Sequence, residues 1–443
     1  MALRASAHLA IATLLATSLL VSRAEGADFL TIEQRTEDFA SFCHFIKEEY
    51  AYFDLKKTDW ERACKFYAPQ VASATDRDAY IEILERALGE LYDPHAHLGT
   101  NTRRSYHLVP TQADLFATWS NGRAILSAVR RSSGAEVAGL LPGMEVVAIN
   151  GEPIETVVSS IEPKFLSRED PAAREWALQV ALAGRRDRDA MKLLTRTGDK
   201  LHEFEFVSIF PEPTSMLSHR VVGNVGYIRI HNSLGQQALI QAFDQAISEM
   251  LGVRALVVDL RDTPSGGNSS VARGIMGRLV EHSLPYQRHE LVSESRSTGI
   301  RRVWVEYVAP RNSPFLKPVV VLVGPWTGSM GEGLAIGVNA TRGSPVLGLP
   351  MAHLLGANGD TALPHSKIVV RVPTEKLFHI DGTPREAFVP CAITPSSATS
   401  PTLDRELSSA IDLALRLSRL KSNPSIGRTH SGLRPPCAAH FNH

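Results

Sequence analysis

A serine between an apolar strand and a helix is the strongest candidate for chemistry in this sequence. Residues 318–323 read PVVVLV, which is typical of a strand buried on both faces, and a glycine-bearing turn leads from them to Ser329. A helix expected from about Ser329 would direct free backbone N–H groups and the positive end of its dipole at that side chain. Such donors can stabilise the oxyanion of acyl transfer, so we predict Ser329 as a nucleophile and the Met330 amide as an oxyanion donor.

The same spacing also has a purely structural explanation. Ser329 and Glu332 stand three residues apart, which is the capping-box pattern of a helix start. Thr327 occupies the place of the first glycine in the G-x-S-x-G turn of α/β-hydrolases, so that particular turn is not the one present here. The serine therefore needs support from a second segment of the chain.

A second strand-to-helix junction supplies that support. Residues 253–260 form another almost wholly apolar run, and Gly266 and Gly267 follow shortly before a helix expected near residues 269–280. Adjacent parallel strands end at the same edge of a sheet, so the two junctions are expected to lie together. We predict that the amide of Gly266 or Gly267 completes an oxyanion hole, although paired glycines also make ordinary turns.

The regions that must position these residues differ in their expected secondary structure along the 443-residue chain. Apolar residues recur at helical spacing between about residues 31 and 91, and short strands with glycine turns follow to about residue 207. From about residue 220 to residue 394 strands alternate with helices, which predicts an α/β layered core. We predict five segments: a signal peptide at residues 1–24, an N-terminal helical region at 28–105, a strand-rich insert at 106–212, an α/β core at 218–420 and a loose tail at 421–443.

The net charge of the chain limits its binding partners, and its amino terminus indicates where the protein is located. Lys plus Arg and Asp plus Glu both number 47, so no net field attracts nucleic acid or an anionic membrane. Arg4, an apolar run from Leu9 to Val21 and the small residues Ser22 and Ala24 are typical of a signal peptide cleaved after Ala24. The run is short for a membrane span, so we expect an exported protein, periplasmic or secreted, with no stable membrane insertion after cleavage. An uncleaved anchor is the alternative.

Part of the insert resembles a PDZ domain. Residues 134–151 read GAEVAGLLPGMEVVAING, which matches the PDZ pattern aGL.pGD.I..InG except that Met144 replaces the aspartate. Asn150 and Gly151 also predict a tight hairpin turn after a buried strand. The resemblance implies that the insert binds an extended peptide, often at a free carboxyl end, as an added strand. The alternative is a module that only packs against the core.

The two junctions resemble those of the C-terminal-processing and tricorn-core family of serine peptidases. Residues 257–268 (VVDLRDTPSGGN) look like the family's strand and glycine loop, and residues 319–333 (VVVLVGPWTGSMGEG) look like the strand that delivers its nucleophilic serine. A later stretch at residues 381–392 also fits, although it lacks the usual Pro-Asp. The resemblance covers roughly residues 30–420. It implies a tail-specific-protease-like hydrolase with a crotonase/ClpP-like α/β core of parallel strands, an N-terminal helical region and an inserted PDZ-like β domain.

The resemblance also implies which residues activate the serine. Processing peptidases of the family use a lysine about two dozen residues after the serine, but residues 348–359 contain none and Lys367 is too late, inside an expected strand. The tricorn-type branch uses a histidine from the segment before the PDZ-like module, and residues 90–98 (ELYDPHAHL) resemble that segment with His95 as the base. A glutamate late in the fold corresponds to Glu386, which would orient His95 directly or through an intermediary.

Other residues compete for these roles. His97 and His353 are alternatives to His95 as the base, and Asp360 and Asp381 are alternatives to Glu386.

Metal binding and disulfides are the remaining questions of side-chain chemistry. His95 and His97 could instead ligate a metal together with Asp93 or His44, but this spacing is a weak zinc signal and we expect neither a metal nor a cofactor. No Cys-x-x-Cys pair occurs. In an oxidising compartment the four cysteines favour disulfides and allow three pairings, among which spacing does not choose: Cys43, Cys64, Cys391 and Cys437.

These observations predict an exported serine peptidase that cleaves peptide bonds through an acyl-enzyme on Ser329. Its partner would be a peptide or protein substrate, with no nucleic acid, and the oligomeric state stays open. One alternative is a non-catalytic protein of the same fold that binds a peptide or an apolar ligand. A second is acyl transfer on an ester or thioester, since one fold can host several reactions.

Overall fold

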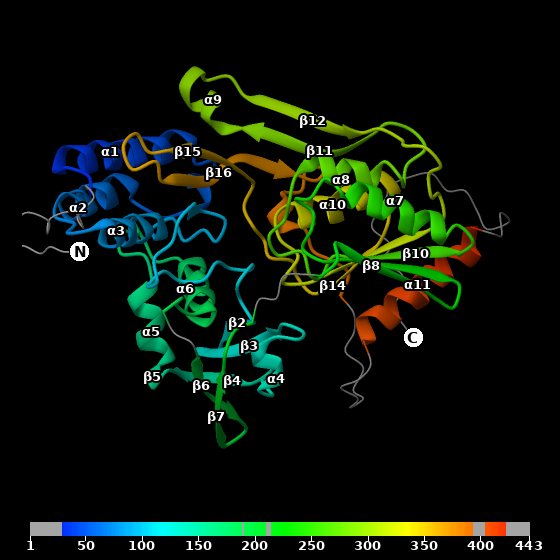
Figure 1. The fold of residues 1–443 in the computed structure, drawn as a ribbon, viewed down its shortest axis with the longest axis horizontal. Helices are drawn as coiled ribbons and strands as arrows, with labels where there is room; N and C mark the ends of the chain where they lie inside the picture. The colour runs from blue at the N-terminus through cyan, green and yellow to red at the C-terminus, as the bar shows by residue number, and fades with distance from the viewer. Residues whose placement is uncertain (1–28, 188–189, 210–213, 393–403, 422–443) are drawn as a thin grey trace, which may run out of the picture.

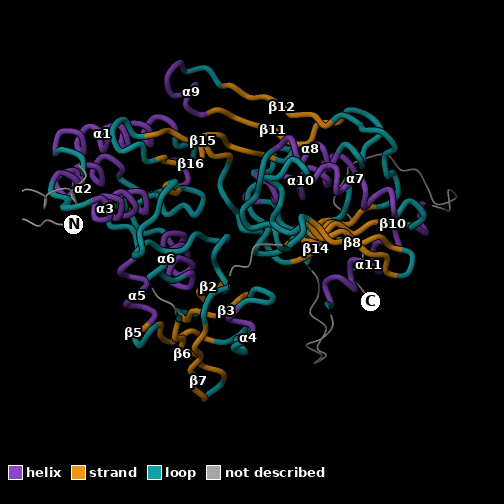
Figure 2. Tube along the Cα trace, in the orientation of Figure 1, coloured by secondary structure: helices purple, strands orange, loops and turns teal. Residues whose placement is uncertain are grey.

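A computed structural model describes residues 29–187, 190–209, 214–392 and 404–421. The predicted signal peptide, nearly all of the predicted tail and Cys437 lie outside these residues. Within the described ranges the chain forms three sheets, one in the insert and two in the remainder (Figure 1; Figure 2). No helix in these ranges has the length and apolar character needed to cross a membrane.

The N-terminal region is helical, which confirms the periodicity seen in the sequence. It consists of α1 (Ile32–Glu49), the 3-10 turn η1 (Phe53–Leu55), α2 (Trp60–Ala72) and α3 (Arg77–Gly89). Thr31, Asp59 and Asp76 accept a backbone hydrogen bond at the starts of α1, α2 and α3, as N-cap residues do. Cys43 in α1 is joined to Cys64 in α2 by a disulfide, which settles one pairing that the sequence left open.

The insert is an antiparallel sheet with helices packed on it. Its strands lie in the order β2-β3-β4-β6-β7, with β5 paired to β4. Asn150 and Gly151 both have positive φ angles, 52° and 85°, and connect β4 to β5 as the predicted tight turn. The elements are β2 (Leu115–Ser120), β3 (Arg123–Val129), α4 (Gly134–Val137), β4 (Glu145–Ile149), β5 (Glu152–Pro153), α5 (Ile154–Ile161), α6 (Pro171–Ala183), β6 (Met191–Thr197) and β7 (Lys200–Phe206).

The second sheet contains both apolar runs, in the order β14-β13-β10-β9-β8. Strands β9, β10, β13 and β14 are mutually parallel and β8 is antiparallel to β9. Helices α7, α8 and α10 pack on one face of this sheet and α11 on the other, so β10 and β13 are buried on both sides (Figure 1). The elements are β8 (Leu217–Val222), β9 (Val225–Ile230), α7 (Leu239–Glu249), β10 (Ala255–Asp259), α8 (Ser269–Met276), β13 (Val319–Val323), α10 (Met330–Arg342), β14 (Val346–Gly348) and α11 (Arg405–Lys421).

The third sheet ties the end of the core to the N-terminal helices. Its order is β1-β16-β11-β12, with β15 paired to β16, and Val370 and Val372 of β16 lie in the same apolar cluster as α1 and α3. In Figure 1, β15 and β16 lie beside the N-terminal helices. The elements are β1 (His97–Leu98), β11 (Leu284–Leu291), α9 (Val292–Thr298), β12 (Arg302–Val308), β15 (Ala357–Ala362), β16 (Val369–Phe378) and the 3-10 turn η2 (Arg385–Ala387).

One detail of this sheet corrects the sequence analysis. Lys367 was expected inside a strand, but it lies in the turn between β15 and β16 with a φ of 58°. Its Nζ donates to the Pro364 carbonyl at 2.7 Å, and the neighbouring His365 and Ser366 amides bind Asp38 of α1. Lys367 therefore belongs to the contact between this sheet and the N-terminal helices.

Candidate active site

Ser329 occupies a strained position immediately before α10. Its φ and ψ are 50° and −114°, a conformation that L-residues rarely adopt and that is typical of residues held by their surroundings at functional sites. Its backbone N–H donates to Oε2 of the buried Glu332 at 2.9 Å. The serine itself is partly exposed although its neighbours Gly328 and Met330 are buried. A reactant could therefore reach the side chain while the backbone beneath it is fixed.

The two predicted junctions do meet at Ser329. Strands β10 and β13 are parallel neighbours, and the N–H of Gly328 donates to the Thr263 carbonyl at 3.2 Å. Gly266 has a φ of +65°, and a Cβ at that position would come within 2.5 Å of Ser329 Cβ and 3.0 Å of its Oγ. Only glycine satisfies both the backbone angle and this close approach.

The three predicted oxyanion donors differ in their present hydrogen bonds. The N–H of Gly266 donates to the Thr263 carbonyl at 3.2 Å and is therefore engaged within its own turn. For the amides of Gly267 and Met330, no acceptor is found among the residues described. Gly267 is held by packing, because a Cβ there would lie 2.2 Å from the Leu234 carbonyl oxygen. The amides of Met330 and Gly267 are thus the two donors that are free to meet a ligand.

His95 makes four hydrogen bonds, one of which is the contact of its carbonyl with His97. Its N–H donates to Asp93 Oδ1 at 2.9 Å, its carbonyl accepts from Asn358 Nδ2 at 2.9 Å, and its Nδ1 lies 2.7 Å from the Leu355 carbonyl oxygen. Since a carbonyl only accepts, Nδ1 must carry the proton and Nε2 keeps its lone pair. Burial lowers the pKa of His95 well below its usual range; the Leu355 carbonyl opposes this shift and the charge of Arg385 adds to it. His95 is therefore a neutral imidazole with Nε2 available as a base.

A short segment, residues 354–356, connects the serine to the histidine. The Leu354 N–H donates to the same Glu332 Oε2 that accepts the Ser329 N–H, at 3.2 Å, and the next residue presents its carbonyl to His95. Three hydrogen bonds, two to Glu332 Oε2 and one to His95 Nδ1, thus link the nucleophile loop to the imidazole through this segment. In the described part of the chain, however, no hydrogen bond joins the Ser329 hydroxyl to an imidazole.

Glu386 was expected to orient His95 directly or through an intermediary, and among the described residues no hydrogen bond joins the two side chains. The Nδ1 of His95 is bound to a carbonyl, and Glu386 Oε2 is a buried oxygen for which the described residues offer no hydrogen-bond partner. Burial raises the pKa of Glu386. Burial also raises the pKa of the Tyr52 hydroxyl, and the charge of Glu386 adds to that shift. Direct orientation of His95 by Glu386 is therefore not formed in the structure.

The competing residues are placed as follows. His97 turns its Nδ1 to the carbonyl of His95 at 3.0 Å, and His353 is an exposed residue whose Nδ1 lies 2.5 Å from the Glu386 carbonyl. Asp360 is exposed and 3.7 Å from Arg371. Asp381 is also exposed and accepts from the N–H of Thr383. Among the described residues no group of three or more His, Cys, Asp or Glu side chains is arranged to hold a metal.

Two residues of this site went unassigned in the sequence. Glu332 had a signal, its spacing from Ser329, but that signal suggested only a helix cap. Arg385 had none: it is 2% exposed, and its Nη2 donates to the carbonyls of Leu354 and Gly356 at 2.8 and 2.7 Å. No local pattern marks an arginine that binds backbone carbonyls about thirty residues away.

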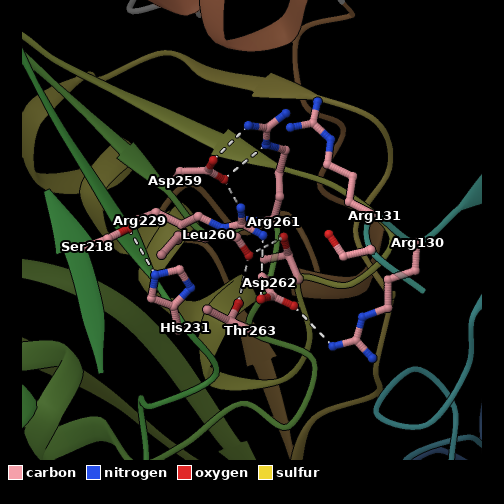
Figure 3. A network of polar contacts seen from close by, with 12 residues as sticks. Arg130, Arg131, Ser218, Arg229, His231, Asp259, Leu260, Arg261, Asp262 and Thr263 are labelled. Carbon is pink, nitrogen blue, oxygen red and sulfur yellow. Dashed lines mark hydrogen bonds and ion pairs between the residues drawn. The ribbon is translucent and has the colours of Figure 1, made fainter. Parts of the chain in front are cut away.

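An ionic network supports the glycine loop from its other side (Figure 3). Arg261 binds the fully buried Asp259 at 2.7 Å, Asp404 at 2.8 Å and Glu406 at 2.6 Å. Although burial acts to raise it, the hydrogen bonds and charge of Arg261 hold the pKa of Asp259 below its ordinary value. Arg131 of the insert joins the same network through Asp404 at 2.6 Å.

A separate ion pair links the insert to the glycine loop. Arg130 of the insert binds Asp262 at 3.0 Å (Figure 3). Asp262 directly precedes Thr263, whose carbonyl holds the Gly266 and Gly328 amides. The insert thus has an ionic contact one residue from the turn that supports Ser329.

The edge of the insert sheet is covered by its own helix. Strand β2 is an edge strand, and the Gln179 amide of α6 binds it twice, with Nε2 donating to the Ala117 carbonyl at 2.6 Å and Oε1 accepting from its N–H at 3.4 Å. Glu175 accepts from the Trp119 N–H at 3.4 Å. Side chains therefore stand where the backbone of an added strand would bind.

A cavity of about 270 Å³ lies between the N-terminal helices and the insert. Asp93, His97 and Val109 are among the residues that line it, and Ser329 is not. Val109 precedes Pro110, which is close enough to Gly328 that a Cβ on that glycine would lie 3.3 Å from the proline ring. The cavity thus ends close to the histidine segment and to the nucleophile turn.

Comparison with known proteins agrees with this fold. Residues 224–395 match the model of peptidase family S41, and residues 33–89 match that of the tricorn protease C1 domain. No curated protein matches the chain. Mature CPAF complexed with lactacystin is similar in structure, with a TM-score of 0.57 and 14% identity over 88% of this chain and 98% of that one. The photosystem II D1 C-terminal processing protease has a TM-score of 0.51 and 16% identity over 85% and 96%.

At such identities the structural likeness shows the fold, a mixed α/β arrangement similar to that of S41 proteases. The family match lies in the segment that contains both junctions. Residues 224–395 are a peptidase family S41 domain, and with the tricorn C1 match they support a serine peptidase related to the tail-specific proteases.

Proposed function

We propose that this protein hydrolyses peptide bonds through an acyl-enzyme on Ser329, with His95 as the base. The observation that carries the proposal is the combination of a strained, accessible serine in contact with Gly266 and an imidazole whose Nδ1–H is already committed to a carbonyl. A serine hydroxyl is a poor nucleophile until a base takes its proton, and a neutral Nε2 is such a base.

The reaction would proceed in two balanced halves. In the first, Ser329 Oγ attacks the peptide carbonyl, its proton passes to His95 Nε2, and the imidazolium returns that proton to the departing amine. In the second, a water molecule attacks the ester, giving its proton to Nε2, and Ser329 leaves with that proton restored. For the proton transfer in the first half, the Ser329 hydroxyl must come within hydrogen-bond distance of His95 Nε2 when substrate binds.

The amides of Met330 and Gly267, with Gly266 as a further donor, would bind the oxyanion. Each such donor contributes about 3 kcal/mol to catalysis. Using Gly266 would require its bond to the Thr263 carbonyl to open, because that N–H is engaged. We assign Glu386 an electrostatic role toward the imidazolium, acting through an intermediary, since its buried oxygen has no partner among the described residues.

We also propose that the PDZ-like insert engages a peptide along β2, by strand addition. Gln179 and Glu175 occupy that edge, so the peptide would have to displace them. A Gln179→Ala variant on an inactive Ser329→Ala background should then bind a labelled peptide more tightly than the background alone. Equal binding in fluorescence anisotropy would contradict strand addition at β2.

We further propose that the protein is exported after cleavage of residues 1–24. Besides the leader sequence, the Cys43–Cys64 disulfide supports this, because such bonds persist in oxidising compartments. Determining the amino-terminal residue of the mature protein tests the proposal, and a retained leader would contradict it.

The catalytic proposal is tested by intact-mass analysis after incubation with a fluorophosphonate probe, comparing the wild type with Ser329→Ala and His95→Ala. We expect a single adduct on the wild type and none on either variant. Loss only in Ser329→Ala would move the base elsewhere, with His353 next. Ser329→Ala should lose about 1 kcal/mol of stability or less, as for a helix cap.

The absence of an adduct on folded wild type would favour a protein that binds peptides without cleaving them. Comparing turnover of peptide and ester substrates then separates a peptidase from an acyl transferase. Near-wild-type hydrolysis by Ser329→Ala would exclude that residue as the nucleophile.

A further inference from the structure

Arg385 is the most deeply buried cation near the site, and its contacts are to backbone. It is 2% exposed, and one nitrogen, Nη2, donates to the carbonyl oxygens of both Leu354 and Gly356. The carbonyl between them, that of Leu355, is the acceptor for His95 Nδ1 at 2.7 Å. The guanidinium thus holds the two residues on either side of the one that orients the imidazole.

Because peptide units are planar, the two contacts of Arg385 also restrict the orientation of the Leu355 carbonyl. Each peptide unit is rigid, so fixing the carbonyls of Leu354 and Gly356 leaves the Leu355 carbonyl little freedom to rotate. The Leu354 N–H is fixed as well, by Glu332 Oε2 at 3.2 Å. Both ends of the segment are therefore held before His95 makes its bond.

Glu332 connects this arrangement to the nucleophile. Its Oε2 accepts the Ser329 N–H at 2.9 Å and lies 3.9 Å from Arg385 Nη2, and the glutamate is 0% exposed. A carboxylate buried to this degree needs a nearby positive charge, which Arg385 supplies. Removing the arginine would therefore disturb both the serine turn and the imidazole.

We propose that Arg385 is a positioning residue that holds residues 354–356 so that the Leu355 carbonyl fixes His95 as the Nδ1–H tautomer. Nε2 is thereby kept free to accept the Ser329 proton. The proposal rests on the proposed function for its effect on rate, but the tautomer of His95 can be measured without any catalysis.

The test compares Arg385→Met, which removes the charge and both donors, with Arg385→Lys, which keeps the charge. For fluorophosphonate labelling of Ser329, we expect the limiting rate to fall about 100-fold in Arg385→Met, because small misplacements of catalytic groups cost this much. The probe's half-saturation concentration should change little. The labelling rate of Arg385→Lys should lie between those of the wild type and Arg385→Met, since an ammonium lacks the planar geometry of the guanidinium.

The second measurement is nitrogen NMR of isotope-labelled histidine rings, with the His95 signals identified by their loss in His95→Ala. Wild type should show a protonated Nδ1, and Arg385→Met should show a mixture of tautomers. Arg35→Met is the matched control, since Arg35 is 8% exposed and also binds three backbone carbonyls, those of Leu30, Val71 and Ala72. It should lower stability while leaving the labelling rate of folded protein and the His95 tautomer unchanged.

An unchanged His95 tautomer in folded Arg385→Met overturns the proposal, as does an equal loss of rate in Arg35→Met. If Arg385→Met does not fold, Arg385→Lys decides by the same NMR criterion. A wild type that never labels would remove the proposed function, yet a tautomer shift in the arginine variants would still support the positioning role.

Discussion

The two strand-to-helix junctions that meet beside Ser329 are held by different forces. The one after β10 is surrounded by ions, because Arg261 binds Asp259 (Figure 3) and also Asp404 and Glu406. The one after β13 is held by neutral groups: the Thr327 hydroxyl donates to the Leu260 carbonyl at 2.9 Å and accepts from the Gly324 N–H at 3.0 Å. The only ion within it is the carboxylate of Glu332.

Solvent access explains the difference. Arg261, Asp404 and Glu406 are 12, 22 and 30% exposed on their side chains, so these three charges keep part of their hydration, and only Asp259 of this group is fully buried. Thr327 and Glu332 are fully buried, where each additional ion would carry a large desolvation cost. The stability of the glycine loop thus depends on ion pairs that salt can screen, whereas the serine turn is stabilised by packing and by hydrogen bonds to the backbone.

The largest effect is expected from Arg261→Met. It leaves Asp259, which is 0% exposed, with the Tyr227 hydroxyl as its remaining side-chain partner, at 2.8 Å. Breaking such a buried pair costs about 3–5 kcal/mol, which urea unfolding would measure. The double variant Asp259→Asn with Arg261→Met should recover part of that loss because no charge is then buried. A loss below about 1 kcal/mol in the single variant would mean that the network does not support the loop.

A smaller effect, visible as a pH dependence, is expected from Glu332→Gln. Burial raises the pKa of Glu332 to about 7, against the opposing influence of Arg385, from an ordinary value of 4.5. The unfolded chain therefore ionises first, and the stability that the proton provides is present below about pH 4.5 and lost by about pH 7. Its full extent is on the order of 3 kcal/mol.

The measurement is the free energy of unfolding of wild type and Glu332→Gln at several pH values across this window. The difference between the two proteins should change steadily from pH about 4.5 to about 7 and stay level above it. Parallel curves throughout would show that Glu332 does not titrate in this window.

The smallest effect is expected from Arg130→Ala, which breaks the ion pair between the insert and the glycine loop. The side chains of Arg130 and Asp262 are 18 and 24% exposed, and Arg229 remains 3.5 Å from Asp262. We expect a loss of about 1 kcal/mol or less, shrinking at high sodium chloride. Arg302→Ala is the control, because Arg302 is 61% exposed in its pair with Glu294. A loss in Arg130→Ala that salt does not change would contradict an ionic contribution.

The sequence predicted the elements whose signals are local. Two almost wholly apolar runs marked β10 and β13 as strands buried on both faces, and their adjacency followed from the parallel α/β pattern. Asn150 and Gly151 predicted their turn because its positive φ angles suit these residues. The predicted domain boundaries stay predictions.

What the sequence could not show depends on contacts between distant segments. The acceptor for His95 is a backbone carbonyl, which every residue carries, so nothing in the identity of Leu355 points to that role. Arg385 reads as an ordinary surface cation until the fold buries it. The family resemblance named Glu386 without fixing whether it meets His95 directly or through an intermediary, and its role stays a prediction.

The covered edge of β2 affects how readily molecules of this protein associate in solution. Unpaired strand edges offer rows of free N–H and C=O groups to other chains and so promote aggregation. Because Gln179 and Glu175 occupy these groups on β2, one molecule is hindered from extending the sheet of another. The two side chains thus protect the protein against edge-to-edge association at high concentration.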